Sequence, residues 1–272
     1  MSRARNRGFT LIEIALVLLI ITILVASIIP GLGAAFEESK RKAVKAQLRE
    51  IQEAMIGYAA VNGRLPCPAS GTSDGVEDPV GGGNCAGTIG LVSHGFVPVA
   101  TLGLLGETNI DGLLLDAWHN PIRYSVAQDA VDPATGPDFT TAGQMRVTGI
   151  ANLTADIVVC TSATLVSTCP DIGGDGNRLR ANQIPALVFS MGRDWSEFSG
   201  ADQQTNAGDP LTPGGAKSIT GTSGTLYPTP GDNVFVSKPF TQVEGDEKFD
   251  DIVSWLPGNL LYTRLIQAGV LP

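Results

Sequence analysis

The chain has 272 residues, of which 43% are hydrophobic, and a formal net charge of −9. This apolar content excludes a disordered protein, and the length accommodates one sizeable domain together with a separate N-terminal element. The negative charge argues against nucleic acid as a direct partner, because an acidic chain repels phosphate backbones.

The N-terminal segment is apolar from residue 9 to residue 29. Its polar residues are Thr10, Glu13, Thr22 and Ser27. As a helix, the segment would be about 30 Å long, which is the thickness of the hydrocarbon core of a bilayer. The charges that flank it are Arg3, Arg5 and Arg7 before the segment and Glu37 and Glu38 after it. The positive-inside rule therefore predicts a cytoplasmic N-terminus and an exported C-terminal part.

An ordinary secretory signal peptide is the alternative interpretation of this segment. Gly33-Ala34-Ala35 supplies small residues for a signal peptidase, and the secreted chain would then begin at Phe36. However, the apolar region is longer than the roughly 7 to 15 residues of a signal peptide. Glu13 also places a carboxylate near its start, and such a group costs about 2.5–3.5 kcal/mol at the bilayer centre and is by default functional. We therefore expect Glu13 to have a partner.

Residues 8–13, Gly-Phe-Thr-Leu-Ile-Glu behind a short basic leader, resemble the class III signal of type IV pilins and type II secretion pseudopilins. The resemblance implies that a prepilin peptidase and N-methyltransferase cuts after Gly8 and methylates Phe9, and that Glu13 guides assembly. It also implies other pilin or pseudopilin subunits, an inner-membrane assembly platform and membrane lipid as partners. Pro30 falls where the family often has a proline, and we expect it to kink the helix.

Glu13 has two candidate partners. Cleavage would create a positively charged amine on Phe9, with an ordinary pKa of about 7.7–8.0. Glu13, one helical turn away, would either neutralise the N-terminus of its own helix or reach the amine of a subunit already in a filament. The second interpretation explains assembly, because an incoming subunit would dock where its charge is met.

An amphipathic continuation of the helix follows Pro30. Its apolar residues recur at spacings of four and three, at Val44, Leu48, Ile51, Met55 and Tyr58. This pattern predicts a helix that continues to about Asn62, packs one stripe on the globular domain, and ends at Gly63 and Pro66. The basic residues around the rest of the helix are either solvated or form a filament contact; they are Lys40, Arg41, Lys42, Lys45 and Arg49.

Four cysteines form two close pairs in turn-rich loops. Three connectivities are open to four cysteines, and short loop closure favours Cys67 with Cys85 and Cys160 with Cys169. Zinc is the alternative, but neither pair has C-x-x-C spacing, and the histidines complete no familiar ligand pattern. Two disulfides indicate an oxidising compartment, which agrees with export.

Two later segments resemble strand motifs of major pseudopilins. Residues 116–124 are similar to the D-P-W-G-N-P turn that starts a strand, with Ala117 in place of proline and His119 in place of glycine, and residues 186–194 are similar to the F-S-x-G-x-D end of a strand. In major pseudopilins the loop after that strand binds calcium. The resemblance therefore implies calcium ligands at Asp194, Glu197 and Asp202, with Asp171 and Asp175 as a second set and a solvated acidic loop as the alternative.

These patterns predict an α+β, pilin-like fold: a long N-terminal transmembrane helix packed through its second half on an antiparallel β-sheet in a loop-rich globular domain. The expected parts are a leader peptide at residues 1–8, the helix at residues 9–62, and a periplasmic or extracellular domain at residues 63–272. A short terminal helix is expected within residues 254–271.

The expected function is that of a structural subunit of a type IV pilus-like filament or type II secretion pseudopilus, which supports protein secretion. It would sit in the bacterial inner membrane as a single-pass protein and then enter the filament, with no required cofactor and calcium as the candidate one. No nucleophile elbow or H-E-x-x-H motif is present in the sequence, which argues against an anchored enzyme. The chain is longer than typical major subunits, so the sequence is also compatible with a minor pilin that primes or caps a pilus and with an adhesive tip protein.

Overall fold

The computed structural model describes residues 10–85, 92–162, 169, 179–193, 201–207, 233–241 and 248–272. It forms two compact units, Met1–Ala43 and Val44–Pro272. The globular unit therefore begins within the N-terminal helix rather than at residue 63, because the amphipathic half of that helix supplies part of its core.

The first element is α1 (Leu11–Asn62), a helix of 52 residues. The apolar stripe predicted for its second half is confirmed at Val44, Leu48, Ile51 and Met55, which are at most 1% exposed, whereas Tyr58 is half-buried. Ile56 and Ala59, which the prediction did not include, are buried as well. The helix ends at Gly63, which takes a φ of +66° and donates its N–H to the Ala59 carbonyl oxygen at 2.9 Å. Glycine adopts this left-handed conformation at the least cost, which makes it the usual helix terminator.

Pro30 lies within the stretch whose backbone is assigned to α1. Its side chain lies outside what the structure describes, so the kink expected there stays a prediction. Within the described part of the chain, no helix is both long enough and apolar enough to cross a membrane.

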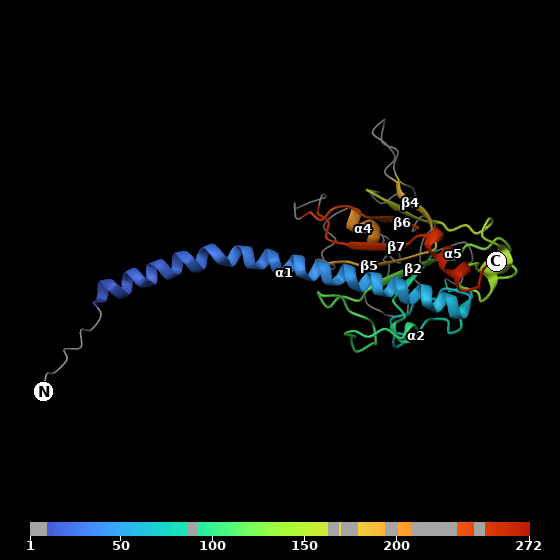
Figure 1. Ribbon diagram of the computed structural model, residues 1–272, viewed down its shortest axis with the longest axis horizontal. Coiled ribbons are helices and arrows are strands. Elements are labelled where there is room, and N and C mark those ends of the chain that lie inside the picture. The colour runs from blue at the N-terminus through green and yellow to red at the C-terminus, as the bar shows by residue number, and fades with distance from the viewer. Residues whose placement is uncertain are drawn as a thin grey trace, which may run out of the picture. The chain divides into compact units, whose positions relative to one another are not determined.

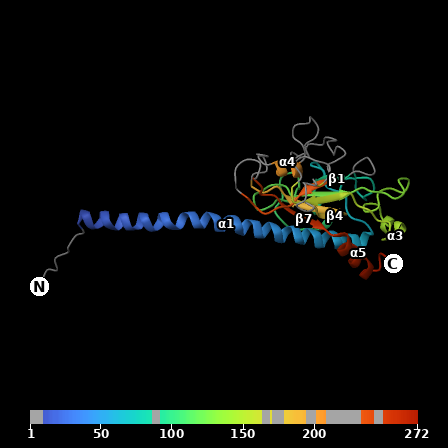
Figure 2. The same ribbon diagram turned by 90° about the horizontal axis from the view of Figure 1, so that it is seen from above.

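A four-stranded antiparallel sheet forms the centre of the globular unit. Its strand order is β1 (Val92–Phe96), β2 (Arg123–Ala127), β5 (Ala186–Ser190) and β7 (Ile252–Leu256). All residues of β1, β2 and β5 are buried, so both faces of these three strands are covered, whereas the middle of β7 is half-buried. The last turns of α1 run along one side of the strands (Figures 1 and 2). The predicted α+β architecture, with a helix and an antiparallel sheet, is confirmed.

A second sheet, which the sequence did not predict, packs near the first. It has the order β4 (Leu179–Ile184), β3 (Ile157–Cys160) and β6 (Val234–Val236), and β3 pairs with β4 antiparallel but with β6 in parallel. The Phe235 ring of β6 meets the Phe189 ring of β5 edge-on, with centroids 5.6 Å apart. The two sheets therefore share one apolar core.

Short helices complete the described part of the unit: α2 (Val99–Leu102), α3 (Gln144–Thr148), α4 (Ala201–Ala207) and α5 (Gly258–Gln267). Figure 2 shows α5 beside the C-terminal end of α1, and Leu261 and Leu265 of α5 belong to the same core cluster as Met55. The short terminal helix expected within residues 254–271 is confirmed as α5, which follows β7 after Pro257.

Candidate functional site

The N-terminus of α1 is capped by reciprocal hydrogen bonds between Thr10 and Glu13. The Glu13 backbone N–H donates to the Thr10 hydroxyl oxygen at 3.3 Å, while the Thr10 backbone N–H and hydroxyl each donate to Glu13 Oε2 at 3.2 Å. This T-x-x-E arrangement is a capping box, which satisfies backbone donors that the first turn of a helix leaves open. The structure thus places Glu13 at the N-terminus of its own helix.

Thr10 is a residue of this site whose role sequence reasoning missed. The signal was available, because a threonine followed three residues later by a glutamate before an apolar run is the pattern of a capping box. Within the described residues, no hydrogen bond reaches the second carboxylate oxygen of Glu13, Oε1. The expected cleavage site, Gly8 and Phe9, lies outside the described residues.

The first turns of α1 expose their apolar side chains. The large hydrophobic residues from Leu11 to Leu24 are 47–89% exposed. A contiguous apolar surface of this kind marks a site covered by lipid or by another protein, since monomeric soluble proteins rarely expose one. The segment is therefore built to be buried by something outside the chain.

The other end of α1 is fixed by a buried ion pair. Arg64 donates two parallel hydrogen bonds to Glu77, at 2.7 and 2.6 Å, and Glu77 also accepts the Tyr58 hydroxyl at 3.0 Å. The side chains of Arg64 and Glu77 are only 6% and 4% exposed. Burial opposes the ionisation of Glu77, but the hydrogen bonds from Arg64 and from the backbone N–H groups of Cys67 and Gly81 outweigh it and lower its pKa. The network joins the helix to the loop that follows.

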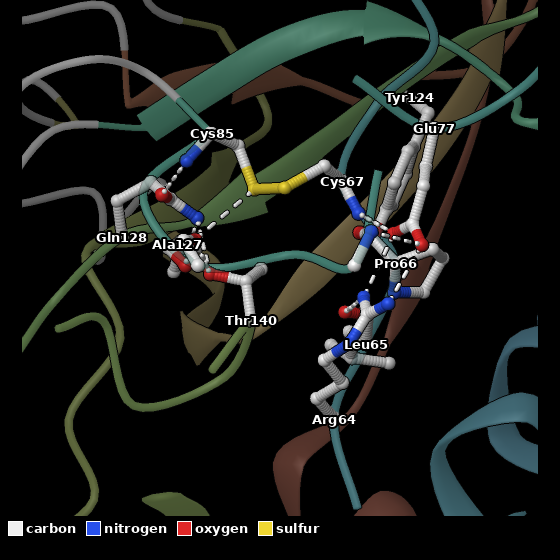
Figure 3. The surroundings of a disulfide bond; sticks show 12 residues. Arg64, Leu65, Pro66, Cys67, Glu77, Cys85, Tyr124, Ala127, Gln128 and Thr140 are labelled. Carbon is white, nitrogen blue, oxygen red and sulfur yellow. Dashed lines mark hydrogen bonds and ion pairs between the residues drawn. A yellow bond between two sulfur atoms is a disulfide. The ribbon is translucent and has the colours of Figure 1, made fainter. Parts of the chain in front are cut away.

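The disulfide Cys67–Cys85 lies beside this network, as Figure 3 shows. The Cys67 N–H donates to Glu77 at 3.0 Å, and the Cys85 N–H donates to the Gln128 side-chain oxygen at 2.7 Å. The second disulfide joins Cys160 to Cys169. Both predicted pairings are confirmed.

The two segments that resemble pseudopilin strand motifs meet in the structure. Asp116 accepts the backbone N–H groups of Trp118 and Asn120 at 2.8 and 2.9 Å. Its other carboxylate oxygen accepts the Ser190 hydroxyl at 2.5 Å. Burial raises the pKa of Asp116, and the hydrogen bond from Ser190 opposes that rise. The carboxylate of Asp116 therefore links the turn before β2 to the end of β5 through hydrogen bonds.

The backbone of this turn explains why the pseudopilin motif has glycine where this chain has His119. His119 adopts a φ of +65°, which is the left-handed region that favours glycine, the residue of the pseudopilin motif at this position. The side-chain amide of Asn120 donates to the Gly192 carbonyl oxygen at 2.6 Å, which is a second link between the segments.

Of the calcium ligands expected from the resemblance, the structure describes Asp202. This residue of α4 accepts a hydrogen bond from Ser162 at 3.0 Å with one carboxylate oxygen and pairs with Lys238 at 2.7 Å through the other. Both carboxylate oxygens of Asp202 are thus engaged by protein groups in this arrangement. Asp194, Glu197, Asp171 and Asp175 lie outside the described residues. Within the part that is described, no group of three His, Cys, Asp or Glu side chains is placed to hold a metal. The calcium site stays a prediction.

Comparison with known proteins bears on the N-terminal segment. Residues 3–29 match a family model described as the prokaryotic N-terminal methylation motif. The chain carries an N-terminal methylation motif. This motif includes Gly8, Phe9, Thr10 and Glu13, so the resemblance to type IV pilins and pseudopilins that residues 8–13 suggested is confirmed.

A curated relative agrees with the methylation motif. Over 75 residues, the chain is 33% identical to the type II secretion system core protein G of Klebsiella pneumoniae. The match covers 28% of this chain and 54% of that protein, so the chain spans about half the length of the relative. No solved structure matches, and the likeness of the globular unit to a pilin domain therefore rests on the sequence motifs.

Proposed function

We propose that this protein is a structural subunit of a type IV pilus-like filament or of a type II secretion pseudopilus, and that it supports protein secretion. The observation that carries the proposal is the methylation motif at residues 3–29. The similarity to a type II secretion core protein and the exposed apolar face of α1 support the same function.

The precursor would be held in the inner membrane by its apolar helix, with the N-terminus in the cytoplasm and the globular unit in the periplasm. A prepilin peptidase would cut between Gly8 and Phe9 and methylate the new amine. The apolar helices would then leave the membrane and bundle in the core of a filament, because each helix buries apolar surface against its neighbours. This role is structural, and the residues described above need perform no catalysis.

Glu13 would contribute the specific electrostatic contact of assembly. Its Oε2 closes the helix of its own chain, whereas Oε1 accepts no hydrogen bond from the described residues. One carboxylate could therefore cap its own helix and accept a charged amine from a neighbouring subunit at once. A carboxylate in an apolar filament core is stabilised only where an opposite charge or donors meet it.

Intact-mass and N-terminal peptide mass spectrometry of the membrane-extracted protein, with and without an active prepilin peptidase, tests this function. We expect a chain that begins at N-methylated Phe9 when the peptidase is active and the full precursor when it is not. A chain that begins at Phe36 in both samples would show a secreted soluble protein and would overturn the proposal.

A subunit at the tip of a filament is the second candidate, because the globular unit contains a surface pocket of about 480 Å³. Trp255 and Tyr262 line this pocket together with Asn182, Gln183 and Asn259. Aromatic rings and amides together are suited to binding a polar ligand. Immunogold labelling separates the candidates, since a major subunit is labelled along the filament and an adhesive or priming subunit only at its end.

A further inference from the structure

Three cations lie on one face of α1. Lys42, Lys45 and Arg49 follow one another at spacings of three and four residues, which places them on the same side of a helix. All three are exposed, whereas the buried stripe that contains Val44 and Leu48 occupies a different side. We call these three residues the basic face.

The basic face has little ionic compensation within its own chain. Lys42 approaches Glu38 at 3.6 Å, but their side chains are 74% and 58% exposed, so this pair contributes little. Elsewhere in the described residues, no ion pair involves Lys45 or Arg49. These charges are therefore open to a partner.

An ordered loop of the globular unit exposes two large apolar side chains. It follows α2 and comprises residues 105–111, which we call the acidic loop. Leu105 is 92% exposed and Ile110 is 97% exposed. Leaving one such side chain in water rather than burying it forgoes about 1.5–3 kcal/mol, so a loop that presents two of them is suited to a contact.

Hydrogen bonds hold the tip of the acidic loop in a defined turn. The side-chain oxygen of Asn109 accepts the backbone N–H groups of Asp111 and Leu113 at 3.0 and 2.9 Å. The Gly112 N–H donates to the Asn109 carbonyl oxygen at 3.1 Å, and the Leu115 N–H donates to that of Glu107 at 2.8 Å. A loop ordered in this way loses little conformational entropy when it binds.

The acidic loop carries the charge that the basic face lacks. Asp111 is exposed, and the side chain of Glu107 is 64% exposed beside His119. The loop contains no lysine or arginine. It therefore offers two carboxylates next to two apolar side chains, which complements a helix face that offers three cations.

Resting on the proposed function as a filament subunit, we propose that the acidic loop of one subunit binds the basic face of α1 in a second copy of this chain. The two surfaces are different, so the contact is heterologous and can repeat from copy to copy. A heterologous contact whose rotation does not close generates an open helical filament. The contact thus adds a polar, orienting interaction to the non-directional packing of the apolar helices.

Charge reversal in the full-length chain, expressed with an active prepilin peptidase, tests the contact. We expect Lys45→Glu with Arg49→Glu, and separately Glu107→Lys with Asp111→Lys, each to lower the yield of sheared filaments by about tenfold or more, because like charges are then apposed. Combining all four substitutions should restore most of the yield. Matched controls at exposed positions outside both surfaces, Arg146→Glu and Glu50→Lys, should leave it unchanged. Equal losses in the four-fold variant and the two parent variants would overturn the proposal.

Cysteine cross-linking identifies the partner directly. All four native cysteines form disulfides, so an introduced cysteine is the available thiol. Coexpression of Lys45→Cys and Ile110→Cys chains should give a disulfide-linked dimer that neither variant forms alone, while Val147→Cys, also exposed, should not replace Ile110→Cys. Dimers of Lys45→Cys with itself at equal yield would overturn the contact. If subunits are processed and every variant gives the wild-type yield of filaments, the contact alone is overturned. If the wild-type chain is neither processed nor assembled into filaments, the proposed function is overturned.

Discussion

Glu13 caps its own helix, and in the proposed filament it would also guide assembly. The capping bonds join it to Thr10, and its charge is the feature that assembly would use. A glutamine keeps an oxygen that can accept the capping bonds but has no charge, whereas a valine loses both.

Substitutions at Glu13 distinguish these roles. We expect Glu13→Gln and Glu13→Val to be cleaved after Gly8 as in the wild type, and both to enter filaments at least about tenfold less well, because hydrogen bonds to a charged group contribute about 1.5–3 kcal/mol. Thr10→Ala, which removes only the capping hydroxyl, should cost about 0.5–2 kcal/mol of helix stability and affect incorporation less. Quantitative blotting of sheared filaments against total processed protein measures the fraction of each variant that enters filaments. Normal incorporation of Glu13→Gln would show that capping alone is required.

Asp129 is a half-buried carboxylate that the sequence did not mark. Its Oδ2 accepts the Asp156 backbone N–H at 3.0 Å. Burial, and then the neighbouring Asp156 carboxylate, raise the pKa of Asp129 from 3.8 to about 7. The folded state therefore binds this proton more tightly than the unfolded state. The resulting stabilisation is complete below about pH 4 and is lost as the pH rises through about 7.

Asp129→Asn should remove this pH dependence. We expect the variant to melt at a higher temperature than the wild type at about pH 8, where Asp129 would be a half-buried anion beside Asp156. The difference should shrink as the pH falls toward about 4. Circular dichroism melts across this range measure it, with the exposed Asp111→Asn as the control. A difference in melting temperature that does not change with pH would contradict the prediction.

At the scale of elements, the junction between α1 and the following loop depends on the pair of Arg64 and Glu77. Glu77→Ala would leave a buried guanidinium without its carboxylate, and we expect a loss of about 3–5 kcal/mol in the free energy of unfolding. Glu38→Ala removes an exposed ion pair of the same helix and should cost less than about 1 kcal/mol. Urea unfolding of the purified protein, followed by tryptophan fluorescence, compares the two. Equal effects would show that burial of the pair contributes nothing.

The sheets show where local pattern and tertiary context diverge. Strands β2 and β5 lie in segments that the pseudopilin-like motifs marked, and the sequence predicted both. Strand β6 has three residues, and it pairs in parallel with β3, which lies far back along the chain, so that Phe235 is opposite Val159. A strand that short has no periodicity to detect, and its partner is chosen by burial of residues such as Phe235 in the shared core.

At the scale of the whole molecule, the predicted calcium site would couple metal binding to the free energy of unfolding. If Asp194 and Glu197 bind calcium, a concentration of 100 times the dissociation constant should stabilise the fold by about 2.7 kcal/mol. We expect a calcium chelator to lower the melting temperature of the wild type, and added magnesium not to restore that temperature. The Asp194→Asn variant should melt at the same temperature with and without the chelator. The Asp202→Asn variant should retain part of the chelator's effect on the melting temperature, since Asp202 already pairs with Lys238. A melting temperature that is insensitive to the chelator would remove the calcium prediction.

The sequence by itself determined the features that depend on neighbours along the chain. The apolar run, the helical stripe through Met55 and the short-range cysteine pairs follow from local spacing, because a helical face and a short loop are set by nearby residues. The methylation motif at residues 3–29 is likewise a pattern of neighbouring residues. Only the tertiary structure decided which distant groups meet. It joined Asp116 to Ser190, buried Arg64 against Glu77 and placed Asp202 beside Lys238, because packing of the sheets and of α1 brings these side chains together at positions that no local pattern specifies.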